Sequence, residues 1–298
     1  MEDAAQDKVN AEVSAYYDSV QWVYNLGHAV YNLGSRKRKA HSVHYGVWLE
    51  DTKSMVDALL NVDILAGKAL DLRSDDALLD AGCGIGGTSV FVASNYGCRV
   101  VGINVSDLQL RQARAYARKA RVDHLVKFMK MDYTRTKFED ASFTKVAGIE
   151  SICYAREKRR FVDEAFRVLK IGGRLVVIDA FLKRAAKSTK EEAELAAFYR
   201  GWKVPSLVTA EEFEGHLGSA GFDPIRYADL TGGTIPTAKV IYNMTLPLYP
   251  LGILLAKLNP SADNLLGHVK ASLSQINLGP YNKDGIISYG MFVAERRA

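Results

Sequence analysis

The feature that most constrains the fold of this chain is an alternation of short apolar runs and amphipathic stretches between residues 77 and 179. The apolar runs have the length of buried strands, and the stretches between them have the spacing of helices that bury one face. Parallel strands need a crossover connection, so this order predicts a mostly parallel sheet with helices on both faces. We expect strands at 77–81, 99–103, 126–130, 143–149 and 174–179, and helices at 88–96, 107–120 and 158–169.

The flanking segments are expected to complete this sheet and to cover one edge of it. Strands at 222–230, after a helix at 210–220, and at 286–295 raise the sheet to seven strands, with the last one antiparallel. The fold class is therefore a doubly wound, Rossmann-like α/β sheet. Gly172 and Gly173 should end the helix at 158–169. The helical segments before and after the core should cover the carboxyl ends of the strands, where ligands bind in open sheets. We divide the chain into an N-terminal helical arm (1–67), a core (68–230), a helical lid (231–284) and the final strand (285–298).

Composition and charge fit a soluble globular protein. The 298 residues are 48% hydrophobic and 24% charged, and the formal net charge is +5. Basic residues gather in short clusters at 36–39 and 156–160, which are typical of solvated faces, although an acidic partner or an anionic membrane surface would fit them too. The polar, acidic N-terminus shows no secretory or transit signal, so we expect a cytoplasmic location.

The cysteines and the most apolar segment argue against two other classes. Cys83, Cys98 and Cys153 are widely separated and lack paired metal-ligand spacing, so we expect free thiols and no metal site. The run 246–258 is shorter than the roughly 20 residues of a membrane-spanning helix, and prolines interrupt it. Three interpretations stay open for it: a buried helix, a wall of an apolar pocket, and a surface that touches a membrane to reach a lipid.

A glycine-rich run at 80–87 follows the first predicted strand. Its Gly82-x-Gly84-x-Gly86 spacing lets the backbone approach a ligand lying across the turn, because glycine has no side chain to hold the ligand away. The spacing differs from the dinucleotide-binding pattern G-x-G-x-x-G, although Gly87 would restore it. Alone, the run indicates a nucleotide-like ligand without identifying it.

Further motifs accompany this run in a fixed order. They are His44–Trp48, Leu79–Gly87, Val101–Gln109, Met131–Tyr133, Glu150–Ser151, Phe166–Gly173 and Gly201–Pro205. With them the chain resembles the class I S-adenosylmethionine (SAM) dependent methyltransferases, and among these the group of sterol, tocopherol and geranyl diphosphate C-methyltransferases and related natural-product enzymes. The resemblance covers residues 44 to 230, which is most of the chain.

The resemblance implies SAM as the cofactor and a set of contacts around the glycine run. Asp80 and Gly82 would contact the methionine part of SAM, while Gly84 and Gly86 would keep the turn open. Tyr45 would close over the cofactor from the N-terminal arm, unless it belongs to the core.

The resemblance also implies contacts at the ends of the second and third strands. Many methyltransferases place a carboxylate on the ribose there, whereas Asn104 and Gln109 would take that role here, since an amide both donates and accepts. Asp132 would accept from the adenine amino group, and Tyr133 beside it is assigned to the same site. As structural alternatives, Asp132 could cap a turn and Asn104 could be a turn residue.

Glu150 follows the fourth predicted strand, in a segment that reads Glu-x-x-x-His in the family that the chain resembles. Here Tyr154 replaces the histidine. A histidine would be a natural general base for a hydroxyl, so its absence weakens O-methylation. Methyl transfer to an alkene or ring carbon creates positive charge, which a carboxylate can stabilise or whose proton it can take. Aromatic faces can add about 0.5–2 kcal/mol each by cation–π attraction.

We therefore expect SAM-dependent C-methylation of a lipophilic acceptor, isoprenoid, sterol-like or prenylated, with Glu150 and Tyr154 in the catalytic site. As an alternative, Glu150 only hydrogen-bonds backbone amides and Tyr154 only packs. A natural-product O-methyltransferase using His44 or His41 as base is a second interpretation, and a non-catalytic SAM-fold binding protein is a third. No nucleic-acid motif or separate basic domain is present. Transient membrane-surface contact and self-association stay open.

Overall fold

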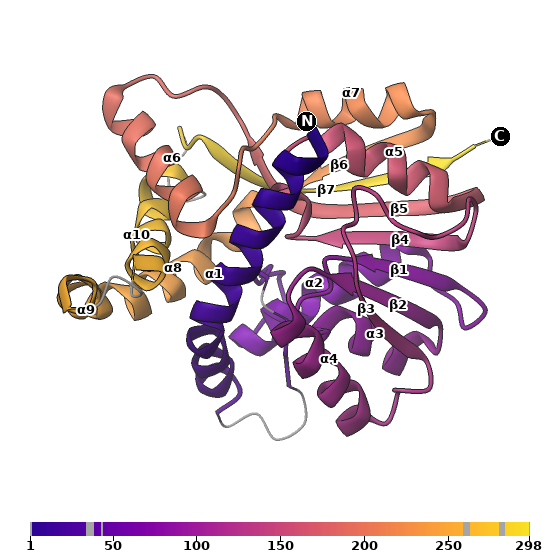
Figure 1. Ribbon diagram of the computed structural model, residues 1–298, viewed down its shortest axis with the longest axis horizontal. Helices are drawn as coiled ribbons and strands as arrows, with labels where there is room; N and C mark the ends of the chain where they lie inside the picture. The colour runs from indigo at the N-terminus through magenta and orange to yellow at the C-terminus, as the bar shows by residue number, and fades with distance from the viewer. Residues whose placement is uncertain (1, 34–38, 43, 259–262, 280–283, 298) are drawn as a thin grey trace.

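A seven-stranded sheet forms the centre of the computed structural model, which describes residues 2–33, 39–42, 44–258, 263–279 and 284–297 (Figure 1). The strand order is β3-β2-β1-β4-β5-β7-β6, and β7 runs antiparallel to both of its neighbours while the other pairs are parallel. This confirms the predicted fold class. The strands are β1 (Ala77–Ala81), β2 (Arg99–Asn104), β3 (Val126–Lys130), β4 (Phe143–Ile149), β5 (Leu169–Leu182), β6 (Phe222–Asp229) and β7 (Ile287–Arg296).

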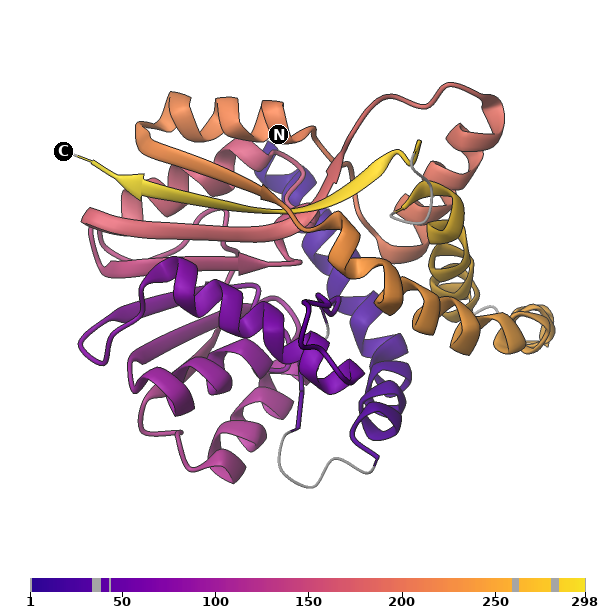
Figure 2. The same ribbon diagram turned by 180° about the vertical axis from the view of Figure 1, so that it is seen from behind.

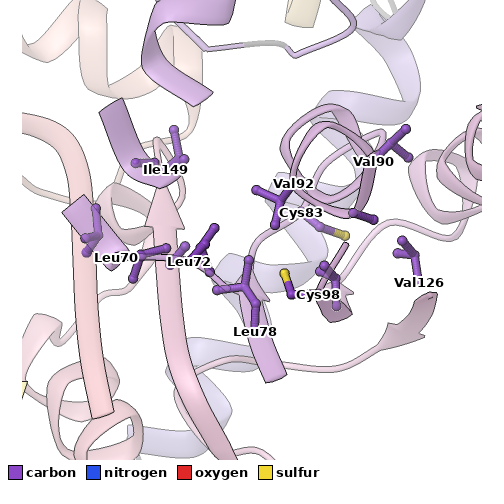
Figure 3. Packing of buried hydrophobic residues seen from close by; sticks show 14 of the residues in the cluster. Leu70, Leu72, Leu78, Cys83, Val90, Val92, Cys98, Val126 and Ile149 are labelled. Carbon is purple, nitrogen blue, oxygen red and sulfur yellow. The ribbon is translucent and has the colours of Figure 1, made fainter. Parts of the chain in front are cut away.

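Helices cover both faces of the sheet, and each face has its own apolar cluster. Leu78 belongs to one cluster and Leu79 to the other, because successive side chains of a strand point to opposite faces. Figure 3 shows part of the first cluster, which includes Leu70, Leu78 and Val92. The first face carries α2 (Met55–Leu70), α3 (Gly87–Tyr96) and α4 (Asp107–Ala120), and the second carries α5 (Lys158–Val168) and α7 (Ala210–Ala220).

The remaining helices gather beyond the carboxyl ends of the parallel strands (Figures 1 and 2). Helices α6 and α10 pack closely, since a Cβ on Gly201 would lie 2.1 Å from the carbonyl oxygen of Gly267. This group therefore forms a cap over the edge where ligands bind in such sheets. It consists of α1 (Glu2–Tyr31), the 3-10 turn η1 (Ile152–Tyr154), α6 (Thr189–Trp202), α8 (Thr231–Thr245), the turn η2 (Leu246–Leu248), α9 (Tyr249–Leu258) and α10 (Asp263–Leu278).

Three observed elements differ from the expectations. Gly172 and Gly173 do not stop a helix: they lie inside β5, where the pairing with β4 shifts register, and Gly172 has a φ of 76°. The glycines thus lie in a β-bulge, where β5 has more residues than the part of β4 that it pairs with. Helix α6 was not expected at all. Helix α2 runs without a break through residue 67, where we divided arm from core.

The apolar run 246–258 is not a fully buried helix. It forms η2 and α9, and Leu246, Leu248 and Leu254 are exposed. Among the residues that the structure describes, no helix combines the length and the apolar character needed to cross a membrane.

Candidate active site

A cavity of about 310 Å³ lies between the carboxyl ends of the strands and the capping helices. It brings together the predicted site residues except Gly86, Asp132 and the alternative base His41, although these residues come from widely separated parts of the chain. The predicted residues that line it are His44, Tyr45, Asp80, Gly82, Gly84, Asn104, Gln109, Tyr133, Glu150 and Tyr154.

The glycine turn between β1 and α3 has a backbone that favours glycine. The φ angles of Gly82, Gly84 and Gly86 are 89°, 52° and 81°, in the left-handed region. A Cβ on Gly82 would lie 2.3 Å from the Cβ of Ser151, so the turn approaches the loop after β4 very closely. Burial raises the pKa of Asp80 to about 6, while its carboxylate accepts from the hydroxyl of Ser89 at 2.5 Å.

A chain of amides follows the end of β2. Asn104 Nδ2 donates to Gln109 Oε1 at 2.7 Å, and Gln109 Nε2 donates to Gln21 Oε1 at 2.9 Å. Helix α1 therefore closes this corner of the cavity. A glycine-rich turn beside polar amides and a carboxylate fits SAM, whose methionine part is charged and whose ribose needs both donors and acceptors. Asp80, Gly82, Gly84, Asn104 and Gln109 would hold it.

Asp132 lies outside the cavity lining, and protein groups already occupy its carboxylate. Oδ1 accepts from the backbone N–H of Thr134 at 2.8 Å, and Oδ2 accepts from Asn10 Nδ2 at 2.9 Å. Neighbouring Tyr133 does line the cavity, and its hydroxyl donates to the carbonyl oxygen of Ser151 at 2.5 Å. The assignment of Asp132 to adenine stays a prediction, and the turn-capping alternative has direct contacts in its favour.

Glu150 sits at the point where β4 leaves the sheet, with a left-handed φ of 46°. Its Oε1 accepts from the backbone N–H of Tyr45 at 2.6 Å and from the hydroxyl of Tyr289 at 2.7 Å. Burial raises the pKa of Glu150 to about 7, although the nearby His44 and the two hydrogen bonds favour its charged form. The carboxyl group can therefore exchange a proton near neutral pH.

His44 belongs to a buried polar network centred on Asp63 of α2. His44 Nε2 lies 3.4 Å from Asp63 Oδ1, which also accepts from the hydroxyl of Thr88 at 2.6 Å. The other ring nitrogen, Nδ1, lies 2.8 Å from the carbonyl oxygen of Tyr45. Burial opposes a charge on His44, but the Asp63 carboxylate outweighs it and raises the pKa. Both nitrogens thus face protein acceptors.

Replacing Asp63 by asparagine is expected to lower the pKa of His44 below its ordinary value of 6.5. Burial would then outweigh the influences that still favour the charged imidazole, which are the more distant Glu150 carboxylate and the carbonyl oxygen of Tyr45. An NMR titration of the carbon-bound ring protons of His44, in the wild type and in the variant, measures this directly. If the pKa of His44 stays raised in the variant, Asp63 does not hold its proton.

Tyrosines form one wall of the cavity. The hydroxyls of Tyr17 and Tyr154 are hydrogen-bonded at 2.8 Å, and the rings of Tyr17 and Tyr24 lie 5.9 Å apart. Burial raises the pKa of Tyr17 and Tyr154 well above the usual tyrosine range, so both hydroxyls stay neutral. The wall therefore offers aromatic faces and neutral hydroxyls to a ligand.

Two buried charged residues outside the predicted set hold η1 in place. Lys158 Nζ donates to the carbonyl oxygens of Cys153, Ala155 and Ser206 at 2.9, 2.6 and 2.8 Å. Burial lowers the pKa of Lys158 to about 8. From the other side, the backbone N–H of Cys153 donates to Asp179 at 2.9 Å. The turn that carries Tyr154 is thus fixed to both α5 and β5.

His41, the second candidate base, lies elsewhere. Its ring contacts that of Tyr116 on α4, at 4.2 Å between centroids, and it lines a separate surface depression with His28 and Lys119. Burial lowers the pKa of His41 to about 4. The structure therefore does not bring His41 to the cavity.

Comparisons with known proteins identify the family to which the chain belongs. Residues 79–177 match the model of a methyltransferase domain. The chain is 33% identical over 197 residues to the 27-O-demethylrifamycin SV methyltransferase of Amycolatopsis mediterranei (strain S699), covering 66% of this chain and 72% of that protein. The chain belongs to the class I SAM-dependent methyltransferases, and SAM is its cofactor.

Two further likenesses place the chain among diverse relatives. It is 26% identical over 226 residues to a sterol 24-C-methyltransferase of Kluyveromyces lactis, covering 75% of this chain but only 60% of that enzyme. The crystal structure of SpnF, a [4+2]-cyclase, superposes with a TM-score of 0.76 at 23% identity over 96% of this chain and 95% of that one. This second likeness establishes the fold alone.

Proposed function

We propose that this methyltransferase transfers the methyl group to a carbon atom of a lipophilic acceptor that is isoprenoid, sterol-like or prenylated. The observation that carries the proposal is Glu150, a carboxylate with a pKa near 7 that lines a cavity walled by tyrosines. The relatives that methylate carbon, such as the sterol enzyme, support it.

The protein side of the reaction is positioning and charge stabilisation. When bound, SAM supplies an electrophilic methyl group. Attack by the π electron pair of the acceptor would take this methyl group from the sulfonium sulfur and would leave positive charge on the acceptor. Glu150 stabilises that charge and takes the proton whose loss restores a double bond. The faces of Tyr17, Tyr24 and Tyr154 stabilise the cation further, and the capping helices limit the access of water to the cavity.

The alternative of O-methylation with His44 as base has less support. Both ring nitrogens of His44 face protein acceptors, so neither is available to take a proton from a substrate hydroxyl. His41 lies outside the cavity. Glu150 could also deprotonate an acidic hydroxyl, and the labelling experiment below distinguishes the two reactions.

Incubation with SAM carrying a labelled methyl group, and with polyprenyl, sterol and phenolic acceptors, tests the proposal. We expect label on a carbon of a polyprenyl or sterol-like acceptor, located by NMR of the product. Label confined to hydroxyl oxygens would contradict carbon methylation. Binding of the demethylated cofactor without transfer to any acceptor would favour a non-catalytic protein.

The rate of methyl transfer is expected to depend on pH through Glu150. The carboxylate must be ionised to accept a proton, and its pKa is raised to about 7, so kcat/KM should rise with pH up to about 7 and level off above it. Below pH 7 the fall approaches tenfold per pH unit. Measuring kcat/KM between pH 5 and about 9 should show this fall on the acidic side. A kcat/KM that does not change with pH would exclude Glu150 as the base.

The proposal includes roles for the surrounding segments. The division into arm, core, lid and final strand is kept as a functional one, in which arm and lid wall the cavity. Leu248 both lines the cavity and is exposed, which supports transient contact with a membrane surface during uptake of a lipid. A cytoplasmic location, self-association and the lack of nucleic-acid partners stay predictions from the sequence.

A further inference from the structure

Two polar side chains of the cavity wall lack partners. Both amide atoms of Gln275, Oε1 and Nε2, and the indole Nε1 of Trp202 are buried without a hydrogen bond to any described residue. Gln275 is only 6% exposed. Leaving a buried amide unpaired costs free energy, so its presence in a cavity wall points to a ligand that completes its hydrogen bonds.

These groups stand in otherwise apolar or neutral surroundings. Gln275 lies on α10, seven residues after His268, so both side chains share the helix face that lines the cavity. Burial lowers the pKa of His268 to about 4, and its Nδ1 lies 2.6 Å from the hydroxyl of Tyr16. Trp202 packs with a small apolar cluster that includes Phe198 and Leu278. The α6–α10 wall therefore offers neutral donors and acceptors.

The charge of the cavity disfavours an anionic acceptor. Among the described residues of its lining there is no lysine and no arginine, whereas Asp80, Glu150 and Asp179 are present. A diphosphate would be held near carboxylates with no lysine or arginine to pair with it, which is unfavourable in a buried site. A hydroxyl or carbonyl oxygen needs no counter-charge.

We propose that the acceptor carries a neutral oxygen group, a hydroxyl or carbonyl, which Gln275 and Trp202 bind at the α6–α10 wall. A hydroxyl can donate to Gln275 Oε1 and accept from an N–H, while a carbonyl accepts from Gln275 Nε2 and Trp202 Nε1. This inference rests on the proposed function, and it selects free alcohols or ketones over diphosphate esters and plain hydrocarbons.

Calorimetric binding to the protein loaded with S-adenosylhomocysteine tests the inference. Two matched sets serve as probes: farnesol, farnesyl diphosphate and farnesene, and cholesterol, cholesteryl sulfate and cholestane. In at least one set we expect the alcohol to bind about tenfold or more tightly than its ester and its hydrocarbon, and Gln275→Leu to remove that preference. Asn277→Leu is the matched control, because Asn277 lies on the exposed side of α10 and donates to Glu194.

The inference is overturned if, in both sets, the alcohol binds no more tightly than its ester or its hydrocarbon. It is also overturned if no alcohol binds at all. A preference that survives Gln275→Leu overturns it as well. None of these results affects the proposed function if labelled methyl transfer still occurs. Conversely, failure to bind S-adenosylhomocysteine would contradict the proposed function itself.

A second measurement needs no acceptor. Without one, Gln275→Leu should raise the melting temperature, because leucine removes two unpaired polar atoms from a buried site. Asn277→Leu should not raise the melting temperature, because this substitution removes the hydrogen bond from Asn277 to Glu194. A lower melting temperature for Gln275→Leu would show that the amide is already paired, for example with trapped water, and would overturn the inference.

Discussion

Replacing Glu150 by glutamine is expected to lower kcat/KM for methyl transfer by about 10²–10⁴-fold, the range that a lost catalytic base or charge stabiliser produces. Glutamine keeps the shape of the side chain and can still accept from Tyr45 and Tyr289, so the cavity should stay intact. It cannot carry the negative charge that a cationic acceptor needs. Affinity for S-adenosylhomocysteine, measured by calorimetry, should therefore change little.

The control for this variant is Glu157→Gln. Glu157 lies in the same connection between β4 and α5, but its side chain is exposed and outside the cavity. It should retain the wild-type rate. If Glu150→Gln retains that rate too, Glu150 serves only to hold the backbone of Tyr45, and carbon methylation loses its main support.

Replacing Gly82 by alanine is expected to destabilise the protein and to abolish SAM binding. The new methyl group would lie 2.3 Å from the Cβ of Ser151, and alanine would have to adopt a φ of 89°. Left-handed strain and overpacking together should lower the free energy of unfolding by about 2–5 kcal/mol. Denaturant titration and calorimetry with S-adenosylhomocysteine measure the two effects separately.

The control for this variant is Gly215→Ala in α7. A Cβ at Gly215 meets nothing within 4 Å, and the residue is in an exposed helix interior, so alanine should stabilise the protein by about 0.5–1 kcal/mol. If the Gly82→Ala variant binds SAM as tightly as the wild type, the turn can move away from Ser151 without weakening cofactor binding. The shape of the turn would then not determine the affinity for SAM.

The part of the fold that follows from local pattern could be predicted from the sequence. The strands at 77–81, 126–130 and 143–149 coincide with β1, β3 and β4, because each is a short segment whose apolar residues are adjacent or alternate with polar ones. Helix α6 escaped prediction because its stability comes from packing against α10, far away in the chain. The bulge at Gly172 could not be predicted, because two consecutive glycines are equally compatible with the end of a helix and with a bulge in a strand.

For the site, sequence reasoning identified residues whose role comes from a motif and missed residues whose role comes from burial. Asp63 occurs in an apolar helix, and its position three residues before Ala66 and four after Leu59 places it on the buried face. Lys158 has the same signal, three residues before Phe161. Such spacing could have found both. Gln275 gives no local signal, and the motif that contains Trp202 does not indicate an unpaired indole. Only the assembled cavity shows that the polar atoms of both side chains lack partners.

The backbone at Glu150 has a consequence for how this protein can evolve. A left-handed φ at a residue other than glycine costs about 1–2 kcal/mol, and a buried carboxylate adds to that cost. Selection for thermal tolerance alone would therefore favour glycine or a neutral residue at position 150. A glutamate that persists there under such pressure marks a position at which activity, not stability, determines the residue.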